Sequence, residues 1–305
     1  MRKIIKAPSG FDTKESEKEF VRLCENDFER RLSQTLREIC DLDDIKVITL
    51  SGPTCSGKTT AAKKIISSFS EIGKRVHVIS IDDFYYDKEI LHRMANEKNG
   101  GEIDYDSVDT IDIDAFAAFA DNIFRQKELL CPTFDFTLGR RVSYRKIACG
   151  EDDIFLFEGI QAVYPEIRSI LDAHGYISVY ISPRSALEVG GELVEPNELR
   201  LLRRIVRDRH FRGTEAEFTF KIWKSVRENE EKNIFPYEDS CSFYIDSTLG
   251  YELGVLKPYL EQYLASVSSD SPYADRAEEI LERISGISPI SSELLSENSL
   301  YKEFV

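Results

Sequence analysis

A ten-residue stretch, SGPTCSGKTT at 51–60, has the residue types and the spacing of a phosphate-binding loop. Four residues separate Gly52 from the triplet Gly57-Lys58-Thr59, and the apolar run IKVITL leads directly into the stretch. Glycines let successive backbone N–H groups point at one anion at the start of a helix. In this pattern the lysine reaches the β- and γ-phosphates of a nucleoside triphosphate, and the next hydroxyl ligates Mg²⁺. A turn that merely joins a strand to a helix is the alternative interpretation.

The pattern predicts binding of ATP or GTP together with Mg²⁺. The residues expected around the nucleotide are Gly52, Thr54, Ser56, Gly57, Lys58, Thr59 and Thr60. The chain has no N-K-x-D motif of the GTPases, and the run FLFEG does not end in the adjacent Asp-Glu of AAA-type ATPases. A small-molecule kinase remains, and such an enzyme needs an acidic metal partner, a base for the acceptor hydroxyl and a basic lid.

Acidic residues follow two apolar runs that read as strands. Glu158 ends the run at 153–159, and Asp82 and Asp83 follow the run at 75–81. An open parallel sheet gathers its ligands at the carboxyl ends of its strands. Glu158 is therefore a candidate Mg²⁺ ligand, and one of the two aspartates is a candidate base for the acceptor hydroxyl. A helix cap or a turn is the structural alternative for these aspartates.

The run RLLRRIVRDRHFRG at 200–213 is a candidate lid. Its arginines recur at helical spacing and share one face, at Arg200, Arg203, Arg204 and Arg207. A solvated basic face is the usual reason for such a run. In a protein of net charge −15, however, this local excess of arginine favours a clamp on phosphate groups.

The composition excludes several other classes of function. The net charge of −15 argues against broad binding of nucleic acid, whose phosphates would be repelled. The six cysteines and four histidines show neither C-x-x-C pairs nor metal-ligand spacing, which disfavours a zinc site and a disulfide framework. No apolar run approaches the roughly 20 residues that span a bilayer. We expect a cytoplasmic protein without a nucleic-acid or membrane partner.

Short runs rich in Val, Ile and aromatic residues predict the strands of a parallel sheet covered on both faces. They lie at 45–50, 75–81, 153–159, 176–182 and 241–247. Helical patterns at 58–70, 112–127 and 198–209 lie between most of them. This alternation predicts an α/β P-loop fold with a doubly wound, mainly parallel sheet and helices on both faces. A β-hairpin that turns at Leu138-Gly139 and the arginine-rich lid are predicted insertions.

We divide the chain into three parts. Residues 1–40 form an N-terminal amphipathic helical extension, with the helix at 14–40, and residues 41–262 form the P-loop kinase domain. Residues 263–305 form a C-terminal extension with one helix at 272–285 and a weakly patterned tail. The aromatic stretch FTFKIWKSV at 218–226 is a candidate interface of a homo-oligomer, although a helix packed on the core accounts for it better.

In motif order, residues 45–260 resemble the uridine/cytidine kinase branch of the phosphoribulokinase/uridine kinase family. The motifs that carry the resemblance are GPTCSGKTT, SIDDFYYD, IDYDSVDTID, PTFDFTLGRR, LFEGI and RLLRRIVRDRHFRG. The run from IWKSV to LKPY further resembles a bacterial subgroup of uridine kinase-like nucleoside kinases. Residues 1–40 and 263–305 lie outside the resemblance.

The resemblance implies a role for each matched residue. Asp82, rather than Asp83, would be the general base and a Mg²⁺ partner, and Thr59 and Glu158 would hold Mg²⁺. Lys58 with Arg203, Arg204 and Arg207 would hold the triphosphate. The acceptor would be bound by Tyr85 beside its ring, by Asp106 at its ribose hydroxyls, and by the hairpin residues Phe134 and Arg141.

Two positions depart from the family pattern. The hairpin histidine that helps to read the pyrimidine is Gly139 here, and the hairpin tyrosine is Phe134. A site that lacks its hydrogen-bonding groups discriminates less between acceptors. The leading expectation is an NTP- and Mg²⁺-dependent kinase of a primary hydroxyl, the 5′-OH of a uridine- or cytidine-like nucleoside. The alternatives are a kinase of another hydroxylated metabolite and a non-catalytic nucleotide-binding regulatory protein.

Overall fold

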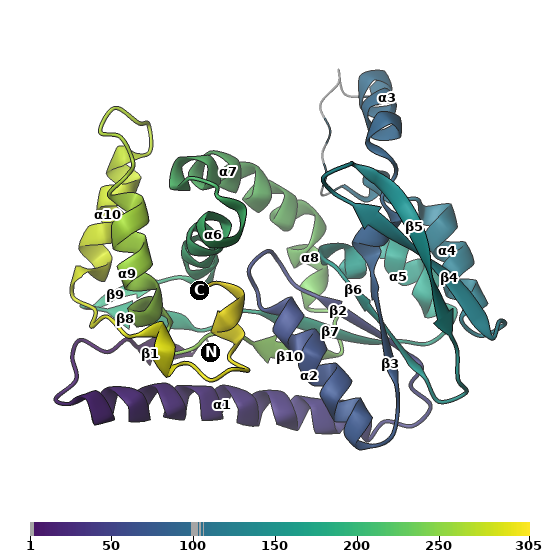
Figure 1. The fold of residues 1–305 in the computed structure, drawn as a ribbon, viewed down its shortest axis with the longest axis horizontal. Helices are drawn as coiled ribbons and strands as arrows, with labels where there is room; N and C mark the ends of the chain where they lie inside the picture. Colours follow the sequence, from purple (N-terminus) through teal and green to yellow (C-terminus); the bar gives the residue numbers. More distant parts are fainter. Residues whose placement is uncertain (1–2, 99–102, 104, 106) are drawn as a thin grey trace.

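A five-stranded parallel sheet forms the centre of the molecule (Figure 1). The computed structural model describes residues 3–98, 103, 105 and 107–305. The strands lie in the order β10-β7-β2-β6-β3, and every neighbouring pair is parallel. Their bounds are β2 (Val47–Ser51), β3 (Val76–Ser80), β6 (Ile154–Glu158), β7 (Ile177–Ser182) and β10 (Phe243–Asp246). The chain proceeds from β2 to one side of the sheet and later to the other, so the crevice that binds ligands in such folds opens beside β2.

Helices cover both faces of the sheet, as the apolar runs predicted. Successive strand residues point to opposite faces, and Ile48 and Leu50 belong to one hydrophobic cluster while Val47 belongs to the other. The first cluster contains residues of α1 (Lys14–Cys40), α2 (Lys58–Glu71), α6 (Pro196–Arg212), α9 (Glu252–Leu264) and α10 (Ala274–Ser285). The second contains residues of α4 (Ile113–Asn122) and α5 (Pro165–Asp172). The predicted doubly wound α/β fold is confirmed.

The predicted hairpin is also present. Strands β4 (Glu128–Asp135) and β5 (Arg140–Ala148) pair antiparallel, with a register shift between Thr133 and Phe134. Gly139 has φ +64° at the turn, a left-handed conformation that glycine adopts freely. Helix α3 (Lys88–Lys98) lies beside the turn, where the Lys88 N–H donates to the Gly139 carbonyl at 2.7 Å.

A second, three-stranded sheet joins the N-terminal strand to the segment before the lid. Its strands are β1 (Ile4–Lys6), β8 (Ala186–Val189) and β9 (Glu192–Val194). The lid helix α6 is followed by α7 (Ala216–Asn233) and α8 (Phe235–Glu238). In α7, Phe220 is buried and stacks on Tyr273 with ring centroids 5.7 Å apart, whereas Phe218 is exposed. In the described residues, no helix is long and apolar enough to cross a membrane.

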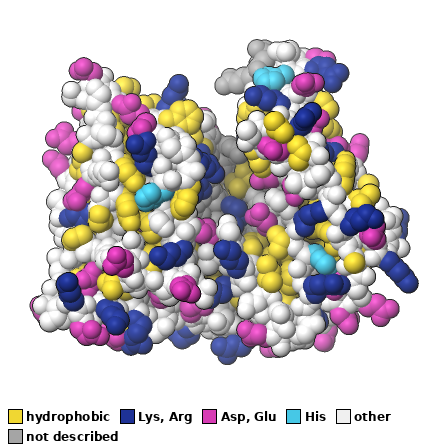
Figure 2. Space-filling model, in the orientation of Figure 1, with side chains coloured by type: hydrophobic (Ala, Val, Ile, Leu, Met, Phe, Trp, Pro, Cys, Tyr) yellow, Lys and Arg dark blue, Asp and Glu magenta, His cyan; other side chains and the backbone are white. Residues whose placement is uncertain are grey.

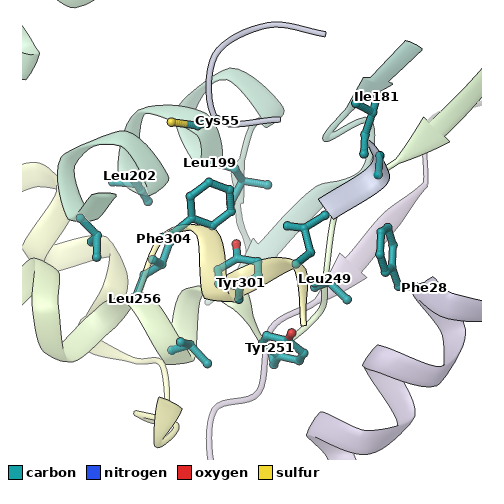
Figure 3. Close-up of a cluster of buried hydrophobic side chains, with 14 of the residues drawn as sticks. Phe28, Cys55, Ile181, Leu199, Leu202, Leu249, Tyr251, Leu256, Tyr301 and Phe304 are labelled. Carbon is teal, nitrogen blue, oxygen red and sulfur yellow. The ribbon is translucent and has the colours of Figure 1, made fainter. Parts of the chain in front are cut away.

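The C-terminal segment packs into the same core as the sheet. Beyond α10 the chain forms two short 3₁₀ turns, Ser292–Leu294 and Leu300–Glu303. Tyr301 and Phe304 are fully buried and lie among Leu199, Leu202 and Leu256 (Figure 3). In Figure 1 this yellow segment lies in the middle of the molecule, beside the start of α2. Sequence patterning shows none of this, because the contacts join residues that lie more than 40 positions apart in the chain.

Candidate active site

The loop between β2 and α2 has the backbone of an anion site. Helix α2 begins at Lys58, and its N-cap residue is Gly57 at φ +99°, which has no side chain to accept from the first turn. The first N–H groups of the helix are therefore available to another acceptor. A Cβ at Gly52 would lie 2.1 Å from the Ile181 carbonyl oxygen, so only glycine fits where the loop leaves the sheet.

The loop forms one wall of a pocket of about 450 Å³ at the carboxyl ends of the strands. In Figure 2 the face shown is hollowed between the side that carries α6 and α7 and the side that carries the hairpin. The pocket brings together most of the residues predicted from the sequence. They are Thr54, Ser56, Gly57, Lys58, Thr59, Asp82, Tyr85, Glu158, Arg204 and Arg207.

Lys58 lies folded back on its own loop. Its Nζ donates to the carbonyl oxygens of Gly52 at 2.8 Å and Pro53 at 3.1 Å. Burial lowers the pKa of the Lys58 ammonium, while the carboxylates of Glu158, Asp82 and Glu303 act in the opposite direction. A lysine held among three carboxylates at an anion-binding loop is placed to meet phosphate oxygens.

Asp82 and Asp83 serve different parts of the site. Asp82 lines the pocket and its Oδ1 accepts from Gln161 Nε2 at 2.9 Å. Asp83 Oδ1 accepts from the Phe134 N–H at 3.0 Å and so holds the hairpin. Burial raises the pKa of the Asp82 carboxyl, and the hydrogen bond from Gln161 and the charge of Lys58 lower it by less. Of the two aspartates, only Asp82 lines the pocket.

The oxygen donors around Lys58 suit a hard cation. The Thr59 side chain is exposed at the pocket, and the carboxylates of Glu158 and Asp82 line it. Burial raises the pKa of Glu158, and the Asp82 carboxylate raises it further while Lys58 lowers it. Two half-buried carboxylates that repel each other and one hydroxyl are a set that Mg²⁺ accepts together with phosphate oxygens. The residues present therefore fit a Mg²⁺ ion.

Tyr85 lines the pocket, whereas Phe134, also predicted to bind the acceptor, does not line it but packs near Tyr85. Tyr85 lies with its ring centroid 5.7 Å from that of Phe134 and 5.9 Å from that of Phe136. The Tyr85 hydroxyl donates to the Tyr105 carbonyl at 2.8 Å. Phe136, which the sequence interpretation did not single out, is 67% exposed. Such rings form a surface on which a planar group can stack.

The other two predicted acceptor residues are Asp106 and Arg141. Asp106 lies outside the described residues. Arg141 does not line the pocket: its Nη2 donates to the Phe84 carbonyl and to Asp112, each at 3.0 Å. In this arrangement Arg141 ties the hairpin to the segments that follow β3 and precede α4.

The four lid arginines divide into two pairs. Arg204 and Arg207 line the pocket, and both pair with the buried Asp208, at 3.1 and 2.7 Å. Arg200 and Arg203 are almost fully buried, in ion pairs of 2.6 Å with Glu230 and 2.8 Å with Glu252. Arg203 also donates to the Cys55 carbonyl at 3.2 Å, so it stabilises the phosphate loop without lining the pocket. Arg212, a further lid residue, lines the pocket as well.

Gln161 is a further residue of the site that sequence reasoning missed. It is fully buried, and its Nε2 donates to Asp82 and to the Tyr85 hydroxyl, both at 2.9 Å. Its Oε1 has no hydrogen-bond partner among the described residues. The only feature of the sequence that could have pointed to Gln161 is its position as a polar residue directly after the motif LFEGI.

The sheet order, the glycine-rich loop on the central strand and the acidic strand ends define a P-loop kinase. The family model of the Phosphoribulokinase / Uridine kinase family matches residues 47–248. The chain belongs to this family. It is 30% identical over 168 residues to a uridine kinase of Lactobacillus helveticus, which is 55% of this chain and 69% of that protein.

Further relatives agree with this assignment. The chain is 26% identical to a uridine kinase of Ureaplasma urealyticum over 59% of its own length and 77% of the relative's. Among solved structures, it matches the YGR205w protein with a TM-score of 0.50 and 17% identity, over 72% of this chain and 89% of that one. This last likeness supports the fold alone.

Proposed function

We propose that the protein is a nucleoside kinase, which transfers the γ-phosphoryl group of ATP or GTP to the 5′-hydroxyl of a uridine- or cytidine-like nucleoside. One observation carries the proposal. Asp82 and Lys58 line the same pocket, and Tyr85, which also lines it, leads into the aromatic cluster with Phe134 and Phe136. A base, a phosphate-binding lysine and a stacking surface are the parts that transfer to a nucleoside requires.

The reaction would proceed by in-line transfer. As the acceptor oxygen bonds to the γ-phosphorus, the bond to the β,γ-bridging oxygen breaks, and the nucleoside diphosphate leaves with that electron pair. Asp82 takes the proton of the acceptor hydroxyl, and its raised pKa brings it closer to the working pH of a base. Lys58, Arg204 and Arg207 stabilise the charge on the phosphate oxygens.

Thr59, Glu158 and Asp82 would hold Mg²⁺, directly or through water. When bound, the ion neutralises charge on the β- and γ-phosphate oxygens. The relatives named uridine kinase support a nucleoside as the acceptor.

A second candidate is a kinase of another hydroxylated metabolite. Phe134 offers no hydroxyl donor, and Gly139 stands where the family pattern has a histidine. A Cβ at Gly139 would lie 2.9 Å from Lys88 Cβ, so the turn itself has no room for a side chain there. An acceptor without a pyrimidine ring would not need either group.

The test is release of nucleoside diphosphate from ATP or GTP with Mg²⁺, across uridine, cytidine, purine nucleosides, ribose, pantothenate and polyols. Turnover with uridine or cytidine that Asp82→Asn abolishes, with the product phosphorylated at the 5′ position by ³¹P NMR, supports the proposal. Turnover with another acceptor alone favours the second candidate. Nucleotide binding without turnover of any acceptor would contradict both and favour a non-catalytic protein.

A further inference from the structure

The C-terminal segment Leu300–Val305 lies directly on the phosphate loop. The Glu303 carboxylate accepts a hydrogen bond from the backbone N–H of Thr60 in the first turn of α2, and Glu303 also lines the pocket. A Cβ at Gly57 would lie 2.5 Å from Leu300 Cδ1, so Leu300 covers the glycine at the helix start. A carboxylate at the N-terminus of a helix takes the place that an anionic ligand would take.

The segment is anchored by the helix that carries the lid arginines. The Tyr301 hydroxyl lies between Arg203 Nε, which donates to it at 3.0 Å, and Glu252, to which it donates. The Arg203 guanidinium carbon is 5.3 Å from the ring centroids of both Tyr301 and Phe304. Both rings are fully buried, and Figure 3 shows them beside Leu199 and Leu202 of this helix. Arg203 also donates to the carbonyl of Cys55 in the phosphate loop. The same guanidinium therefore binds both the segment and the loop.

The Glu303 carboxylate lies where a phosphate group of a donor nucleotide would bind. The loop N–H groups cradle the α- and β-phosphates, and the lysine reaches the β- and γ-phosphates. The γ-phosphate end must face Asp82, which follows β3 at one edge of the sheet. Thr60 lies in the first turn of α2, so Glu303 occupies one of the N–H groups at the start of this helix.

We propose that Leu300–Val305 is an intramolecular ligand of the phosphate loop, in which Glu303 takes the place of a donor phosphate and the buried rings of Tyr301 and Phe304 anchor the segment. The inference rests on the proposed function in one respect, that the loop binds a nucleoside triphosphate. The Glu303 carboxylate and a donor phosphate exclude each other at the Thr60 N–H, so this carboxylate has to leave before the donor binds. The apparent affinity for the donor is then reduced by the fraction of molecules in which the segment is bound.

The first experiment compares Glu303 with Glu297, a glutamate just before the segment. Glu303→Ala removes the carboxylate at Thr60, and Glu297→Ala removes an exposed one three residues before Leu300. Isothermal titration with Mg²⁺–ATP should show about tenfold tighter binding for Glu303→Ala and no change for Glu297→Ala. Unchanged or weaker binding in Glu303→Ala would overturn the inference, because the carboxylate would then not compete with the nucleotide.

The second experiment tests the whole segment. A chain ending at Asn298 should bind Mg²⁺–ATP more tightly still, and the peptide SLYKEFV added to it should compete with the nucleotide. The matched peptide SLYKAFV should compete about tenfold less well. Circular dichroism and thermal unfolding establish whether the shortened chain is folded, and if it is not, the two glutamate variants decide the question.

The outcomes separate this inference from the proposed function. Equal affinity of the intact, Glu303→Ala and shortened chains for Mg²⁺–ATP overturns the competition and leaves the kinase intact. No nucleotide binding by any folded variant overturns both. Tighter binding after removal of the segment, but no turnover with any acceptor, supports the competition and contradicts the kinase.

Discussion

The side-chain amide of Gln161 donates to Oδ1 of Asp82 at 2.9 Å, and the same nitrogen donates to the hydroxyl of Tyr85. The proposed base and the aromatic residue at the acceptor pocket are thus held by one buried side chain. Gln161 is a positioning residue: it orients the carboxylate of Asp82 and stabilises its ionised form.

Replacing Gln161 by Leu should shift the acid limb of the pH–rate profile to higher pH. Burial already raises the pKa of Asp82, and the hydrogen bond from Gln161 lowers it, so loss of this bond raises the pKa further. A base acts only when deprotonated, so activity is lost as the pH falls through this pKa. We expect kcat to fall about tenfold near neutral pH and to recover partly at higher pH. A uniform loss at every pH would contradict the role.

The two pairs of lid arginines should respond differently to substitution. Arg207→Ala should lower kcat/KM about a hundredfold, because the guanidinium lines the pocket, with little change in Tm. Arg203→Met should cost about 3–5 kcal/mol of stability, because it leaves Glu252 buried without its partner. Thermal unfolding and steady-state kinetics on both variants check the division. A stable Arg203→Met protein with impaired catalysis would reverse the assignment.

Asp153 should contribute stability that is lost in acid. Burial alone would raise its pKa, but hydrogen bonds from Arg75, the Gly150 N–H and His77 outweigh this and lower the pKa to about 2. A depressed carboxyl pKa contributes stability above about pH 4, and this contribution disappears as the pH falls towards 2.

Because Arg75 is more than half exposed, we expect the contribution to be about 1–2 kcal/mol. Asp153→Asn should lower the free energy of unfolding at pH 7 by this amount and flatten its dependence on pH between 4 and 2. The neighbouring Asp152, whose side chain is 88% exposed, provides the control Asp152→Asn. Equal effects of the two substitutions would argue against the buried network.

Phe134→Tyr should sharpen the choice of acceptor if the substrate carries a pyrimidine. The new hydroxyl would restore a donor on the ring that lies 5.7 Å from Tyr85. We expect the ratio of kcat/KM for uridine to that for ribose to rise about tenfold. Phe218→Tyr, on the exposed face of α7, is the control. No change in this ratio of kcat/KM values would favour an acceptor that carries no nucleobase.

Local patterns in the sequence were enough to predict the central sheet, the phosphate loop and the hairpin. Each depends on residue types within a few positions: Gly57 where the helix start requires a left-handed residue, or the continuous apolar runs of buried strands. The division of the lid could not be predicted in this way. Arg203 and Arg204 are adjacent on one helical face, and Arg203 is buried because Glu252 and Tyr301 meet it from 49 and 98 residues away.

The C-terminal segment was beyond prediction for the same reason. Its sequence lacks strong periodicity, and its packing depends on Gly57, Thr60 and Arg203, which belong to distant elements. Gln161 likewise shows its role only through Asp82 and Tyr85, which lie 79 and 76 residues before it.

Asp82 and Asp83 are neighbours joined by one peptide bond, but their side chains have different partners. Asp83 holds the hairpin through the Phe134 N–H, whereas Asp82 lines the pocket beside the phosphate loop. A hairpin displaced by an arriving acceptor would pull on the backbone that carries the base. The single peptide bond between the two aspartates therefore couples the position of the hairpin to that of the proposed base.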